Sequence, residues 1–319
     1  MHMTDTTASS DKGRFTATIT ANVKIGACFW RMDMRFEGAG GQAFAQFRPG
    51  QFLQIDASDA ALPAPENIPP ELRDAAHRKV LLRRPFSFAE VTPQIGATMA
   101  ELLYCVVGPA SLRMTTLRHG DTVDIVGPLG NGFWVPEGKR TALLVVGGMG
   151  VPPIRCLAKT LTADYGDIET YAFVGAKTVG AFPFEGKLDE VSQQLGFSVP
   201  AFARFGIPSV LTTDDGSAGA QGLVTEHLAQ WLDDNHDRPK EETIIYACGP
   251  EPMLAAVAKM TIERNIDCQV SMERRMACGI GLCQSCAIEC RVPDSDETVY
   301  KLCCQDGPVF DARDVVWES

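Results

Sequence analysis

Apolar and polar residues alternate without a break near the start of the chain, from Phe15 to Val23. A period of two predicts a half-buried β-strand. Short runs rich in β-branched and aromatic residues follow, separated by turn dipeptides such as Pro49-Gly50 and Gly108-Pro109. These runs predict further strands at residues 29–36, 52–56, 81–91, 102–107 and 122–126. Several short strands at this rhythm indicate a small antiparallel β-barrel.

The strand pattern is interrupted over residues 57–79, which are rich in alanine, proline and charged residues. No apolar periodicity runs through this stretch, so we expect a mobile insertion loop at the surface.

The pattern changes near Pro136, where wholly apolar runs begin to alternate with runs of helical period. Strands are predicted at residues 141–146, 171–174, 209–213 and 243–247. Helices are predicted from the glycine loop to residue 164 and at residues 187–195, 222–233 and 252–266. This alternation predicts a parallel α/β sheet covered by helices.

Together these patterns predict a multidomain β plus α/β protein. A disordered tail is expected at residues 1–13, a barrel at 14–135, an α/β domain at 136–266 and a small C-terminal domain at 267–319.

Composition narrows the class of protein. The 319 residues are 45% hydrophobic and 22% charged, as in ordinary globular proteins. The formal net charge of −11 argues against nucleic acid as a partner. Residues 1–12 contain no apolar leader, and the most apolar stretch, 141–154, is short and broken by glycine and proline. We therefore expect a cytoplasmic protein with no membrane segment.

Four cysteines near the C-terminus have the spacing of metal ligands. Cys278, Cys283 and Cys286 read C-x4-C-x2-C, and Cys304 follows. This is the ligand pattern of a plant-type 2Fe–2S cluster. Zinc and disulfides are the alternatives, but zinc usually takes two close cysteine pairs and only one is present. Spacing alone leaves Cys303 open as the fourth ligand, because it adjoins Cys304 and only one of two neighbouring strand residues faces the cluster.

Two glycine-containing turns lie where an α/β sheet binds ligands. Gly147, Gly148 and Gly150 sit between a predicted strand and helix, where a dinucleotide pyrophosphate docks, although a plain tight turn looks similar. Cys248 begins a Cys-Gly-Pro turn at the end of the last predicted strand of that domain. It either borders a nicotinamide or simply ends the strand.

A third motif lies on the predicted barrel. Arg84, Pro85, Phe86 and Ser87 combine a guanidinium suited to phosphate, a ring able to cover a flavin and a hydroxyl donor. An ordinary barrel strand with an exposed arginine is the alternative.

Taken together, the motifs resemble the ferredoxin–NADP reductase superfamily, and more specifically the electron-transfer subunits of class 1B dihydroorotate dehydrogenases. The resemblance runs from Phe15 to residue 318 and includes D-G-P-V-F at residues 306–310. In that family the last cluster cysteine lies two residues before this motif, which selects Cys304.

The resemblance implies FAD, a 2Fe–2S cluster and NAD as cofactors. Arg84 would hold the FAD pyrophosphate, Phe86 and Ser87 would flank the flavin, and Gly108 and Ser111 would form a second phosphate-binding turn. The glycine usual between these two is Ala110 here, which weakens that assignment.

The resemblance also implies a partner. Electrons would come from an FMN-containing dihydroorotate dehydrogenase subunit, cross the cluster and FAD, and reduce NAD+ for pyrimidine biosynthesis, in a complex with two copies of each subunit. No catalytic acid–base residue is needed. Two alternatives stay open: an NAD(P)H–ferredoxin module of a bifurcating transhydrogenase or sulfide dehydrogenase, and a zinc-stapled nucleotide-binding module without enzymatic activity.

Overall fold

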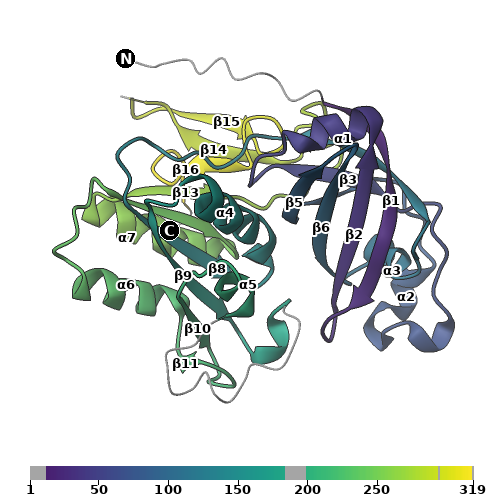
Figure 1. Ribbon diagram of the computed structural model, residues 1–319, viewed down its shortest axis with the longest axis horizontal. Coiled ribbons are helices and arrows are strands. Elements are labelled where there is room, and N and C mark those ends of the chain that lie inside the picture. Colours follow the sequence, from purple (N-terminus) through teal and green to yellow (C-terminus); the bar gives the residue numbers. More distant parts are fainter. Residues whose placement is uncertain (1–11, 184–198, 294, 318–319) are drawn as a thin grey trace.

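The computed structural model describes residues 12–183, 199–293 and 295–317 (Figure 1). It contains two seven-stranded sheets and a two-stranded hairpin. The tail over residues 1–11 and the helix expected at residues 187–195 lie outside the described residues.

The first sheet is antiparallel throughout, with the order β4-β3-β7-β1-β2-β6-β5. Its strands are β1 (Gly13–Lys24), β2 (Phe29–Glu37), β3 (Phe52–Asp56), β4 (Arg84–Phe86), β5 (Phe88–Gln94), β6 (Ala97–Cys105) and β7 (Thr122–Leu129). Alternation predicts β1 correctly, since Ala17 and Ile19 are fully buried. The antiparallel sheet is confirmed, whereas its closure into a barrel stays a prediction.

Two details of this sheet differ from the expectation. The single strand expected at residues 81–91 is divided at Ser87 into β4 and β5. A helix, α1 (Gly38–Ala45), follows β2, and its Phe44 stacks on Phe36 at 4.1 Å between ring centroids.

The insertion after β3 has a packed interior. It contains the short helices η1 (Pro65–Asn67), η2 (Pro70–Leu72) and α2 (Arg73–Ala76). Ile68, Leu72 and Ala76 are buried against Leu112 of α3 (Pro109–Met114). The Arg113 guanidinium also donates to the Ala60 carbonyl at 2.8 Å. The insertion therefore braces α3, while its mobility stays a prediction.

The second sheet has the order β11-β10-β9-β8-β12-β13-β16. Its strands are β8 (Thr141–Gly147), β9 (Glu169–Ala176), β10 (Ser209–Thr213), β11 (Ala220–Gln221), β12 (Thr243–Cys248), β13 (Asp267–Ser271) and β16 (Val309–Asp311). All neighbours are parallel except β13 and β16. The parallel α/β sheet is confirmed, and its last two strands come from the range expected for the C-terminal domain.

Helices cover both faces of this sheet. The helices of this part are η3 (Gly148–Gly150), α4 (Val151–Asp164), η4 (Val179–Ala181), α5 (Pro200–Ala203), α6 (Val224–Asp234) and α7 (Glu251–Arg264). Of these, α4 and α5 pack on one face and α6 and α7 on the other. Leu143 and Val145 of β8 belong to the core under α6 and α7, whereas Leu144 and Val146 belong to the core under α4. Burial on both faces explains why β8 is apolar along its length.

The C-terminal segment lies against both sheets and is yellow in Figure 1. It adds the antiparallel hairpin of β14 (Ala287–Arg291) and β15 (Thr298–Leu302). Phe52 and Leu129 of the first sheet share a core with this hairpin's Ile288. The Asn131 amide also donates to the carbonyls of Asp306 and Val309, at 3.0 and 2.8 Å.

An ionic cluster joins the first sheet to the helices α4 and α5, which cover the second sheet. Arg155 of α4, only 7% exposed, pairs with Glu90 of β5 at 3.3 Å and Glu101 of β6 at 2.5 Å. Lys159 and Arg204 also reach Glu90, both at 3.0 Å.

Among the described helices, none is long and apolar enough to cross a membrane.

Candidate electron-transfer site

The four spaced cysteines form two pairs. Cys283 lies within hydrogen-bonding reach of Cys278, and Cys304 lies within reach of Cys286. Cys283 is exposed, whereas Cys286 and Cys304 are buried. A two-iron cluster held by four thiolates needs two for each iron, and these pairs fit that arrangement. Within the described parts of the chain, no three or more His, Cys, Asp or Glu side chains lie close enough together to hold a single metal ion.

Backbone N–H groups already point at these sulfurs. The amide of Gly281 donates to Cys304 Sγ at 3.2 Å, and the amide of Cys283 donates to Cys278 Sγ at 3.4 Å. Gly281 has a φ of 88°, which glycine adopts without strain. A loop that turns its N–H groups inward suits a negatively charged cluster.

Cys303 faces the other way. It is fully buried, and its thiol donates to the Met272 carbonyl at 3.3 Å. Cys304 is the member of the adjacent pair that shares the loop interior with Cys286. This geometry supports Cys304 as the fourth ligand.

The thiols differ in acidity because their surroundings differ. A hydrogen bond with the Ser285 hydroxyl lowers the pKa of Cys283 to about 6. Burial raises the pKa of Cys304 to about 12. Because the thiolate is the form that binds metal, a buried ligand needs the positive charge of the metal to ionise.

The two glycine turns of the second sheet pack backbone to backbone. They follow β8 and β12, which are adjacent parallel strands with Val146 opposite Cys248. A Cβ on Gly150 would overlap the Cys248 carbonyl, and one on Gly147 would lie 2.6 Å from Pro250 Cδ. Gly148, with a φ of 50°, has open space around it. The turns thus leave bare backbone at the carboxyl edge of the sheet, where α/β sheets bind ligands.

A cavity of about 270 Å3 brings three of the predicted motifs together. It is lined from the first sheet by Pro85, Phe86 and Ser87 and from the second by Met149 and Cys248. Its remaining lining includes Ser271, Met272, Glu273, Arg274, Met276 and Pro308. The cavity therefore lies where both sheets meet the segment that leads into residues 278–286, the cysteine loop.

Glu273 is a cavity residue that the motifs alone do not predict. The residue is exposed overall, yet desolvation raises the pKa of its carboxyl group. Burial also raises the pKa of Cys248, and the negative charge of Glu273 raises it further. Cys248 is therefore a neutral thiol at physiological pH.

Arg84, Gly108 and Ser111 do not line this cavity. The Arg84 guanidinium is half-buried and donates to the carbonyls of Leu82 and Arg83, at 2.9 and 3.2 Å. The Ser111 hydroxyl accepts from the backbone amide of Gly108 at 3.2 Å, so it already stabilises its own turn. Their contact with phosphate stays a prediction.

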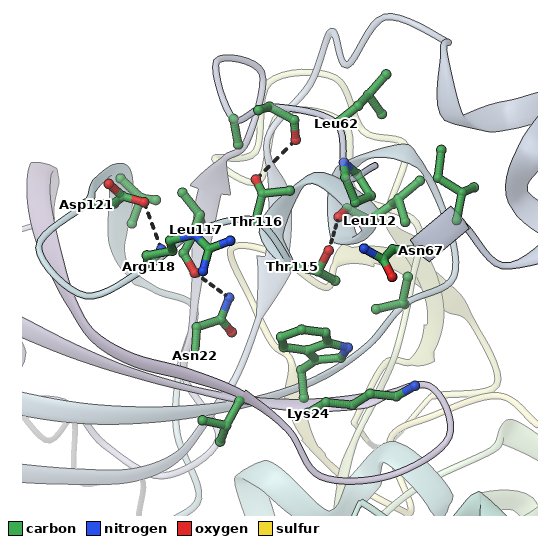
Figure 2. Close-up of a pocket in the computed structure, with 18 of the residues that line it drawn as sticks. Asn22, Lys24, Leu62, Asn67, Leu112, Thr115, Thr116, Leu117, Arg118 and Asp121 are labelled. Atoms are coloured by element: carbon green, nitrogen blue, oxygen red, sulfur yellow. Dashed lines mark hydrogen bonds between the residues drawn. The ribbon is translucent and has the colours of Figure 1, made fainter. Parts of the chain in front are cut away.

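A second, broader cavity of about 2210 Å3 lies between the insertion, α3 and the ends of β1 and β2 (Figure 2). Its lining includes Leu62 and Asn67 of the insertion, Leu112 of α3 and Thr116, which follows α3 (Figure 2). Thr116 donates to the Ala61 carbonyl at 3.1 Å. None of the predicted site residues lines this cavity, so it is separate from the candidate site.

Comparison with known proteins matches two parts of the chain to family models. Residues 273–316 match the model of the iron-sulfur cluster binding domain of dihydroorotate dehydrogenase B, and residues 144–259 match that of the oxidoreductase NAD-binding domain. The dihydroorotate dehydrogenase B (NAD(+)) electron transfer subunit of Caldanaerobacter subterraneus subsp. tengcongensis is 33% identical over 94% of this chain and 98% of the relative. That of Bacillus caldolyticus is 38% identical over 84% of this chain and 87% of the relative.

The chain belongs to the family of dihydroorotate dehydrogenase B electron transfer subunits. The resemblance inferred from the motifs is confirmed. Among solved structures, a chain of the NADH-dependent reduced ferredoxin-NADP oxidoreductase is 26% identical, with a TM-score of 0.68 over 94% of this chain and 90% of that one. Amycolatopsis cytochrome P450 reductase GcoB shares the fold, with a TM-score of 0.57 at 20% identity, over 83% of this chain and 70% of that one.

Proposed function

We propose that this electron transfer subunit carries electrons from a catalytic dihydroorotate dehydrogenase subunit to NAD+, in pyrimidine biosynthesis. It would hold a 2Fe–2S cluster, FAD and NAD. The cavity that joins Ser87, Cys248 and Met276 carries the proposal, because it connects the flavin motif, the nicotinamide motif and the segment that leads into the cysteine loop. The family membership supports the same cofactors.

The cluster would be held by Cys278, Cys283, Cys286 and Cys304, and when bound it transfers single electrons. The chain's own contribution would be to bind and orient the cluster, and the paired thiols and the amide donors support this position for it. The cytoplasmic location expected from the sequence fits thiols that must stay reduced.

The flavin and nicotinamide rings would meet in the cavity beside Phe86, Ser87 and Cys248. The exposed backbone around Gly148 would receive the NAD pyrophosphate. Arg84 would bind the FAD pyrophosphate outside the cavity, beside the turn of Gly108 and Ser111, since none of these three lines it. We accordingly assign FAD to residues 14–135, NAD to residues 136–266 and the cluster to residues 267–319.

The cysteine loop is also the proposed contact with the catalytic subunit. Its apolar side chains Ile280 and Leu282 are 51% and 79% exposed, and Leu282 directly precedes the exposed Cys283. Exposed apolar groups beside a redox centre favour a protein partner that covers them. We propose an FMN-containing partner and a complex with two copies of each subunit, which native mass spectrometry would test.

The decisive experiment mixes the purified subunit with a dihydroorotate dehydrogenase catalytic subunit from the same host. We expect flavin and iron–sulfur absorption bands in the subunit alone, and NAD+ reduction by dihydroorotate only in the complex. A colourless subunit would favour the alternative of a zinc-stapled nucleotide-binding module without enzymatic activity. Coloured protein that binds a larger iron–sulfur flavoprotein instead would overturn the assigned partner.

One observation favours a second candidate function. The solved structure at 26% identity belongs to a reduced ferredoxin–NADP oxidoreductase, which fits the bifurcating module. The curated relatives at 33–38% identity favour the first. Co-purification of the chain from its native host would separate the two, since the first predicts a dihydroorotate dehydrogenase catalytic subunit as the partner and the second a larger iron–sulfur flavoprotein.

A further inference from the structure

Gln54 lies where the flavin motif meets the cysteine loop. It is in the middle of β3, opposite Pro85 of β4 and Val126 of β7. Its side chain is 2% exposed, which is uncommon for an amide. Because β4 carries the flavin motif, any group that Gln54 contacts beyond the sheet is held at a fixed distance from that motif.

The amide nitrogen of Gln54 is buried without a hydrogen-bond partner among the described residues. A buried donor that stays unpaired is costly, so such donors in native proteins usually have a partner in the functional state. The neighbouring Gln51 illustrates the usual situation, because its buried amide donates to the Gly130 carbonyl at 3.1 Å.

The unpaired nitrogen abuts the cysteine loop. A Cβ on Gly279 would collide with Gln54 Nε2, so the amide occupies the space that any larger residue would need. Gly279 directly follows Cys278 and has a φ of 70°. Gln54 is absent from the lining of the cavity where the flavin and nicotinamide rings would meet. The donor therefore faces the cluster side of the sheet and not the ring side.

We propose that Gln54 Nε2 donates a hydrogen bond to a sulfur of the iron–sulfur cluster and thereby sets the cluster's reduction potential. The inference rests on the proposed function, because it requires a cluster in the cysteine loop. Hydrogen bonds to cluster sulfurs are one of the factors that set such potentials. A donor stabilises the reduced state more, since that state carries an additional negative charge.

Gln305 provides a matched control. A Cβ on Gly281 would collide with Gln305 Oε1, so this glutamine abuts the same loop two residues further along. It differs from Gln54 in being exposed and in presenting its oxygen. Water competes for hydrogen bonds at this exposed position, and an amide oxygen cannot donate a hydrogen bond to a cluster sulfur.

The test compares Gln54→Met, Gln54→Glu and Gln305→Met in the full subunit by potentiometric titration followed by electron paramagnetic resonance. We expect Gln54→Met to shift the one-electron reduction equilibrium about tenfold toward the oxidised cluster, or about 59 mV. Gln54→Glu keeps the shape, and its shift should grow as the pH rises through the pKa of the new carboxyl group, because only the ionised form replaces the donor by an anion. Gln305→Met should change the one-electron reduction equilibrium of the cluster by less than about twofold.

The outcomes distinguish this inference from the proposed function. An unchanged potential in Gln54→Met, with iron content equal to the unmodified subunit, would overturn the inference alone. Should Gln54→Met fail to take up iron, Gln54→Glu decides the question by the same criterion. A subunit that contains no cluster in its unmodified form would instead refute the proposed function.

Discussion

Single residues at the site divide into those with a local sequence signal and those without one. The spacing of Cys278, Cys283 and Cys286 is visible in the sequence, and the structure brings them together with Cys304. Gln54 carries no such signal, because it meets Gly279 only after the first sheet and the C-terminal segment have packed together. Contacts between distant segments depend on tertiary packing, which a single sequence does not reveal.

The fourth cluster ligand is tested at this scale. We expect Cys304→Ala to remove most of the cluster, because one iron loses a thiolate that the loop cannot replace. Cys303→Ala should retain it, since that thiol donates to the Met272 carbonyl away from the loop. Iron content and visible absorption measure both, and loss of iron in Cys303→Ala alone would reverse the assignment.

Secondary-structure elements followed the hydrophobic pattern where one period dominated. The alternation of β1 and the apolar run of β8 both predicted the observed strands. The pattern failed at α1, because three of its first four residues, Gly38, Gly40 and Gly41, are glycines with low helix propensity. Burial of Phe44 against Phe36 stabilises this helix instead.

The ionic cluster between α4 and β5 makes the packing of these elements sensitive to acid. Burial disfavours ionised Glu90, but hydrogen bonding and charge from Lys159, with the charges of Arg204 and Arg155, outweigh it and lower its pKa. A carboxyl group with a lowered pKa stabilises the fold above its unfolded pKa of about 4.3, and this contribution is lost as the pH falls further.

We therefore expect Glu90→Gln to lower the free energy of unfolding by on the order of 2 kcal/mol at neutral pH. The difference from the unmodified protein should shrink below pH ~4. Thermal unfolding at neutral pH and below pH ~4 measures this difference in stability. Glu169→Gln, which breaks the exposed pair with Arg238, is the control and should leave the midpoint unchanged. A stability difference between the unmodified protein and the Glu90→Gln variant that does not vary with pH would contradict this explanation.

At the scale of the whole molecule, the sequence predicted the order of the three functional parts but not how they interlock. The antiparallel sheet and the parallel α/β sheet were both expected. The pairing of β13 with β16 was not, because the two strands are separated by the cysteine loop and the β14–β15 hairpin. Short strands at such separation carry too little periodicity to show which partner they will find.

Association with the catalytic subunit is also a property of the whole molecule. We expect Leu282→Asp to weaken the complex at least tenfold, because it places a charge in an apolar contact beside Cys283. Leu223→Asp is the matched control, since Leu223 is 51% exposed and precedes α6 in the α/β domain. Surface plasmon resonance measures the affinity for the catalytic subunit, and the affinity of the control variant should be unchanged. Equal weakening by both variants would exclude the cysteine loop as the specific contact.

The placement of β13 and β16 bears on how this protein could be taken apart. Here a cut after residue 266 would strip two strands from the second sheet and expose the edge of β12, which is buried along its length. The cluster segment therefore cannot be removed without breaking the second sheet, and a chain truncated after residue 266 should aggregate through its new open edge.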